Sequence, residues 1–171
     1  MTTPRKFRAL RGRLAALHGE PNPELYGAQV ADVLSTLPNS ITPLESPFDD
    51  PLEQYNCYMF ALQLVDRLEA APFPPIVACN SEFVLSLIEH GYLERVRRAV
   101  RGELIAYFDS DALCHMGRVV RGGRIISKWG RGHLYAHGRW EISQSFGEKL
   151  VFYKNLLSVE ETIQRLQHFN A

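Results

Sequence analysis

The 171-residue chain lacks several features that would assign it to a broad functional class. Its three cysteines, Cys57, Cys79 and Cys114, form neither the even set of a disulfide framework nor the close pairs of a structural zinc site. The 19 basic and 19 acidic residues cancel, so no overall charge favours nucleic acid or membrane surfaces. No apolar run approaches the roughly 18 residues of a membrane span. We therefore expect a globular domain in a reducing compartment, without metal or membrane span.

The N-terminal segment has basic residues but no acid before Glu20. No continuous apolar region follows, so we expect no secretory signal peptide. The predicted location is cytoplasmic, with export by another route left open. Leu10, Leu14 and Leu17 have helical spacing, and a packed amphipathic helix with a solvated basic face explains the segment better than targeting does.

Helical patterns occupy the first half of the chain and strand patterns the second, which predicts one α+β domain. The predicted parts of the domain are N-terminal helices and a loop (1–55), a core (56–154) and a C-terminal helix (158–171). Within these parts we expect a helix over 23–37 and a helix that begins at Cys57. We also expect a helix capped by Ser81 and a final helix that begins with a Ser158–Glu161 capping box. β-Branched and aromatic residues predict strands over 103–108, 115–120, 124–129 and 149–154.

Cys57 is the first candidate for chemistry. It follows Asn56, a favourable N-cap residue, and so falls in the first turn of the predicted helix. Unpaired amides and the helix dipole stabilise negative charge there, so we expect the thiol pKa to be lowered. The alternative is that Cys57 is a small core residue.

His115 is the candidate base, at the start of a predicted strand. The order is that of a papain-type nucleophile and base: the imidazole takes the thiol proton and the sulfur attacks an acyl carbon. The Cys57 backbone N–H is placed to stabilise the oxyanion. A buried strand histidine bonded to a carbonyl is an equally good interpretation of His115.

The hairpin after this strand decides which residue shares the face of His115. A two-residue loop at Gly122 and Gly123 puts Lys128 on that face, whereas a three-residue loop that begins at Arg121 puts Ser127 there. Sequence leaves both open.

Other candidates follow this hairpin. His133 and His137 are either orienting groups for the imidazole or surface histidines, and the stretch WGRGHLY must fold back if His137 is to reach the site. Asn56, Lys128 and Trp129 are candidates for substrate contact. For Trp129 the alternative is core packing, and for the basic residues around Lys128 it is a solvated sheet edge.

The runs NCYMFAL, GELIAYF and HMGRVVRGGRIISKWG resemble the NlpC-type branch of the papain-like superfamily over roughly 56–153. In that family a cysteine opens a helix, a Gly-Asp-Leu strand follows, and His-x-Gly begins a strand–turn–strand. Glu103 replaces the aspartate here. The family's third polar residue, usually histidine, falls near Ser127, which weakens the triad or moves the orienting role to His137. The stretch from Ser127 to Gly147 also resembles a bacterial subgroup with Ser-Lys-x-Gly and Phe-Gly segments.

This resemblance implies a papain-like (NlpC-type) fold and amide hydrolysis without a cofactor, with a peptide or peptidoglycan stem peptide as substrate. The cysteine precedes the histidine, which favours peptidase or amidase chemistry over the lipid acyl transfer of permuted relatives. Cys57 and His115 then act with His137 or Ser127. The rivals are a deamidase or transglutaminase-like effector, which implies a cognate inhibitor or immunity protein, and an inactive binding module on the same scaffold.

Overall fold

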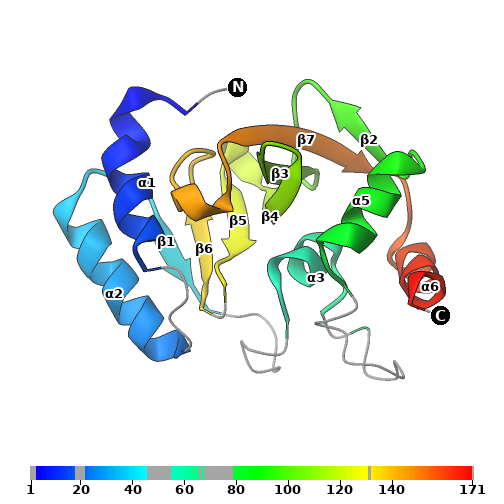
Figure 1. Cartoon of the computed structure of the whole chain (residues 1–171), viewed down its shortest axis with the longest axis horizontal. Coiled ribbons are helices and arrows are strands. Elements are labelled where there is room, and N and C mark those ends of the chain that lie inside the picture. The colour runs from blue at the N-terminus through cyan, green and yellow to red at the C-terminus, as the bar shows by residue number, and fades with distance from the viewer. Residues whose placement is uncertain are drawn as a thin grey trace.

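The computed structural model describes residues 3–17, 22–45, 55–65, 67, 79–130 and 132–170 (Figure 1). Its helices are α1 (Arg8–Ala15), α2 (Pro23–Thr36), α3 (Cys57–Leu62), α5 (Ser81–Glu89) and α6 (Val159–Phe169), with 3₁₀ turns η1 (Arg5–Phe7), η3 (Arg121–Gly123) and η4 (Gln144–Phe146). The strands are β1 (Thr42–Leu44), β2 (Leu93–Val96), β3 (Leu104–Asp109), β4 (Ala112–Val119), β5 (Ile125–Lys128), β6 (Leu134–His137) and β7 (Lys149–Asn155).

Seven strands of the described residues form one antiparallel sheet in the order β1-β6-β5-β4-β3-β7-β2. Figure 1 shows α1 and α2 at one end of the molecule and α5 and α6 at the other, with α3 between them. The α+β prediction is confirmed. The four predicted strands are present as β3, β4, β5 and β7, while β1, β2 and β6 were not predicted. These three strands are short, and they form by pairing with neighbouring strands of the sheet rather than from a strong strand pattern of their own.

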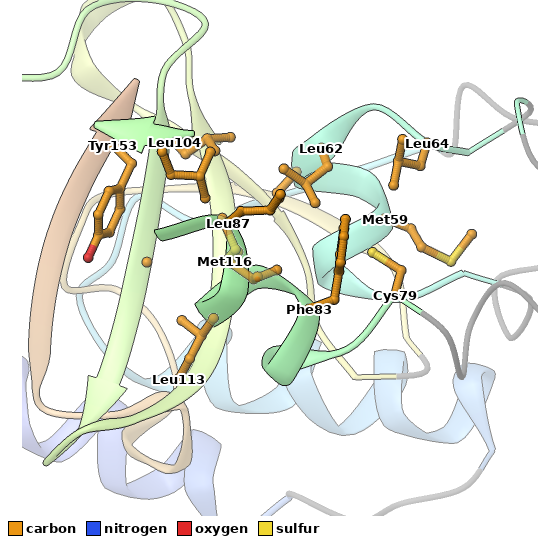
Figure 2. Packing of buried hydrophobic residues seen from close by; sticks show 14 of the residues in the cluster. Met59, Leu62, Leu64, Cys79, Phe83, Leu87, Leu104, Leu113, Met116 and Tyr153 are labelled. Carbon is orange, nitrogen blue, oxygen red and sulfur yellow. The ribbon is translucent and has the colours of Figure 1, made fainter. Parts of the chain in front are cut away.

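Two apolar clusters cover the two faces of the sheet. The α3 core contains Met59 and Leu62 of α3 together with Phe83, Leu104 and Met116, all drawn in Figure 2. The α1 core contains residues of the first two helices and the opposite faces of the strands, including Leu14, Val30, Ile105, Tyr107 and Trp129. Because successive residues of a strand point to opposite faces, β3 alternates between the two clusters.

Helix ends follow local signals with two corrections. The Ser158–Glu161 capping box is present, as predicted. The cap of α5 is Asn80 rather than Ser81, since the Asn80 side chain accepts from the Phe83 amide at 3.0 Å. Helix α3 is shorter than its apolar pattern suggests, because Gln63 adopts a left-handed conformation with φ 62° and ends it. Leu64 and Val65 still pack into the α3 core beyond the end of the helix, and Leu68 lies outside the described residues.

The first helix also departs from its expected solvated basic face. Arg11 is buried, and its guanidinium donates to the Gly147 carbonyl at 2.6 Å. Over the part of the chain that the structure describes, no helix is long and apolar enough to cross a membrane.

Candidate functional site

Cys57 occupies the first position of α3, as the sequence predicts. The Asn56 side chain caps the helix by accepting from the Tyr58 and Met59 amides at 3.0 and 2.9 Å. Its amide group also donates to the Cys79 carbonyl at 2.8 Å, which ties the start of α3 to the segment before α5. Asn56 therefore positions Cys57; its expected contact with substrate stays a prediction.

The Cys57 thiol does not have the lowered pKa expected from its helix position. Burial raises the pKa of the Cys57 thiol to about 11. A backbone hydrogen bond from Met116, the charge of Lys128 and the amides of Cys57 and Tyr58 all act in the opposite direction, so the helix-terminus effect exists but is outweighed. The expectation of a lowered thiol pKa is wrong, because the sequence does not show how far packing on the sheet desolvates the sulfur.

His115 lies within β4 rather than at its start, because the strand begins at Ala112. Its side chain faces the α1 core: the ring stacks on Phe146 at 4.2 Å between centroids and lies 5.9 Å from the ring of Tyr107. His115 is 1% exposed, and burial, together with the charges of His137 and Lys128, holds its pKa well below 6.5. Its Nε2 is buried without a hydrogen-bond partner. The imidazole is therefore neutral, with a nitrogen available to accept or donate a proton.

The Cys57 thiol contacts β4 at Met116, the residue after His115. The His115 ring, however, lies on the other face of this strand, against Phe146. The thiol bonds the backbone of Met116, whose side chain belongs to the α3 core. No hydrogen bond joins the thiol to the imidazole in the described structure. The β4–β5 ladder contains only the pairs Arg118–Ile126 and Val119–Ile125, and α3 packs against both strands. The start of α3 thus lies where the two strands cease to pair.

The hairpin resolves the choice between Ser127 and Lys128. The three-residue turn η3 makes the Val120 amide donate to the Arg124 carbonyl at 2.8 Å, which is the longer of the two loops considered. Ser127 therefore shares the face of His115, and Lys128 lies on the face of Met116.

Ser127 and His137, the two rivals for the third position, bond each other at 2.8 Å between Oγ and Nε2. The stretch after β5 folds back as β6 and pairs with β5. His137 Nδ1 lies 2.8 Å from the Gly138 carbonyl, which can only accept, so Nδ1 carries the proton and Nε2 accepts from Ser127. Trp129 Nε1 donates to Ser127 Oγ at 3.0 Å. Burial lowers the pKa of His137 to about 4, so its ring is neutral and its Nε2 can only accept. The hydrogen bonds therefore run in one direction, from Trp129 to Ser127 and from Ser127 to His137.

Glu141 continues this polar network and was not found from sequence. Its carboxylate, 5% exposed, accepts from the amides of Ser40 at 2.7 Å and Gly138 at 2.8 Å. Burial raises the pKa of Glu141, but these bonds and the Ser40 hydroxyl outweigh it and hold the pKa below its usual value. The one signal in the sequence was an acid between Trp140 and Ile142, both buried.

Lys128 and Trp129, the other expected substrate contacts, are both 0% exposed. Trp129 belongs to the α1 core, which confirms the alternative of core packing. The Lys128 ammonium donates to the carbonyls of Gly130 and Gly132 at 2.8 and 3.1 Å. Of the neighbouring basic residues, Arg124 bonds the Ala136 carbonyl at 2.7 Å, and Arg131 lies outside the described residues.

These features define a class of protein: an α+β domain in which a cysteine opens a helix packed on an antiparallel sheet. A family model described as "Domain of unknown function (DUF7689)" matches residues 48–154. Because the match covers more than half of the chain, the protein belongs to this family. The matched range includes Cys57, His115, Ser127 and His137. No curated protein matches the chain. No solved structure matches it either.

Proposed function

We propose that this protein is a papain-like cysteine hydrolase of amide bonds, with Cys57 as nucleophile and His115 as base. One observation carries the proposal: the amides of Cys57, Tyr58 and Met116 surround the thiol, and His115, the residue before Met116 in β4, has a neutral imidazole with an unpartnered buried nitrogen. Amides gathered at a helix start also stabilise an oxyanion at the same place.

The chemistry begins from a neutral pair. His115 takes the thiol proton as the Cys57 sulfur attacks the carbonyl carbon, whose oxygen becomes negative. The C–N bond breaks, the leaving amine takes the proton, and water then hydrolyses the thioester. These reaction steps require the thiol–imidazole contact to form when substrate binds, since no hydrogen bond joins the two groups in the ligand-free structure.

The Ser127–His137 pair supports the site as a unit. Ser127 and His137 lie on the α1 face of the sheet, the face of His115, and a proton on His137 would lower the pKa of His115, so the neutral His137 leaves His115 free to take a proton. We assign this pair a positioning role rather than the role of a third catalytic group, because both nitrogens of His137 are already engaged. Peptide and peptidoglycan stem peptides are the proposed substrate classes.

The test uses p-nitrophenyl acetate, an activated ester that reports acyl transfer whatever the natural substrate is. We expect acetylation of Cys57, found by mass spectrometry of peptides, and steady release of nitrophenolate that is lost in Cys57→Ala and in His115→Gln. Cys114→Ala is the matched control and should behave as wild type. Acetylation of Cys114 alone, or of no cysteine, would reject the assignment.

A binding module on the same scaffold is the second candidate. The raised thiol pKa and the missing thiol–imidazole bond favour it. It predicts no turnover of p-nitrophenyl acetate by the folded wild-type protein, and the same experiment therefore separates the two functions.

A further inference from the structure

Lys128 is a buried cation at the end of β5, beside the candidate nucleophile. It is 0% exposed, and long cationic side chains are almost never fully buried unless their charge is compensated. Its ammonium donates to the Gly130 and Gly132 carbonyls and lies 5.0 Å from the centroid of the Tyr55 ring. The charge is therefore held in place by the backbone after β5 and by an aromatic ring.

The position of this charge is set by two neighbouring segments. The β4–β5 register puts Lys128 on the same face of the sheet as Met116, whose backbone bonds the Cys57 thiol. Tyr55, under the ammonium, precedes Cys57 by two residues. The same cation thus lies between the strand that carries His115 and the segment that presents Cys57.

We propose that Lys128 supplies the positive charge of the Cys57 centre, stabilising negative charge on the sulfur and on the acyl oxygen and favouring electrophiles that bear a carboxylate beside the reacting carbon. This inference rests on the proposed function for the identity of the nucleophile. A fixed cation in a water-poor site stabilises charge that develops during attack without needing to reorganise.

Lys128 and His115 then have separate roles. The charge of Lys128 lowers the pKa of both Cys57 and His115, so it favours an anionic sulfur and disfavours an imidazolium. His115 moves the proton, while Lys128 balances the negative charge. A thiolate–imidazolium pair would instead assign both tasks to the histidine.

The experiment compares two alkylating reagents that differ in charge. Iodoacetate and iodoacetamide both transfer carbon to sulfur and release iodide, but only iodoacetate carries a carboxylate. Rates at Cys57 and Cys114 are measured by peptide mass spectrometry at low ionic strength, where charge effects are least screened. The proteins are full-length wild type, Lys128→Met, Lys128→Arg and, as a matched control for net charge, Lys154→Met, which removes an exposed lysine of β7.

We expect the iodoacetate-to-iodoacetamide ratio at Cys57 to fall about tenfold in Lys128→Met and to stay near the wild-type ratio in Lys128→Arg and Lys154→Met. An unchanged ratio in folded Lys128→Met overturns the proposal. If that variant does not fold, the wild-type protein decides: the ratio must be about tenfold higher at Cys57 than at Cys114, and equal ratios overturn it.

Alkylation requires neither His115 nor hydrolysis, so this result is separate from the ester assay. Selective iodoacetate alkylation without ester turnover would leave Lys128 as the charge of a non-catalytic thiol site. Ester turnover without charge selectivity would leave the hydrolase and remove Lys128 from its mechanism.

Discussion

Alkylation of Cys57 should be slow at neutral pH and should keep accelerating to about pH 11. Burial raises the pKa of its thiol from the ordinary 9.0 to about 11. At pH 7 this leaves about a hundredfold less thiolate than an ordinary thiol has. A more basic thiolate is also more nucleophilic, with a Brønsted slope of about 0.4–0.5, which recovers roughly tenfold. The net expectation is a rate about tenfold below that of an ordinary accessible cysteine.

The assay treats the folded protein with iodoacetamide over a series of pH values and follows each cysteine by peptide mass spectrometry. Cys114 gives the reference rate within the same sample, and Cys79, which is 0% exposed, reports any opening of the fold. Circular dichroism at each pH confirms that the protein remains folded. A Cys57 rate that levels off below about pH 9, or that exceeds the Cys114 rate at neutral pH, would show that desolvation does not control this thiol.

Three further predictions concern the surroundings of the site. Glu141→Gln should lower the free energy of unfolding by about 1–3 kcal/mol at neutral pH. The Glu141 carboxyl has a lower pKa in the folded protein than in the unfolded chain, so the stabilisation it provides is complete above the unfolded pKa and is lost as pH falls through the folded pKa. The urea midpoints of Glu141→Gln and wild type should therefore converge in acid. A difference between the two midpoints that stays constant with pH would refute this. Gly117→Ala should cost about 1–3 kcal/mol, since a Cβ there would meet the Ile126 carbonyl at 2.8 Å, and a thermal midpoint equal to wild type would contradict the packing. Ser127→Ala and His137→Ala should each destabilise the protein, and a double-mutant cycle should give a coupling of about 0.5–3 kcal/mol, whereas additive losses would mean that their hydrogen bond contributes nothing.

The sequence by itself determined the features that depend on neighbouring residues. Asn56 caps α3 and the Ser158–Glu161 pair caps α6, because both use side chains within three residues of the amides they satisfy. β-Branched and aromatic runs gave β3, β4, β5 and β7 for the same local reason. The α+β class and the place of Cys57 at a helix start follow from these signals.

Tertiary structure decided the features that depend on register and burial. One residue in the hairpin loop placed Ser127, rather than Lys128, on the face of His115, and the return of β6 joined Ser127 to His137. The pKa of Cys57 reversed direction because helix-end amides act locally, whereas desolvation of the sulfur depends on what the sheet packs against it. No pattern along the chain contains that information, since the residues that remove water from Cys57 are brought there only by the fold.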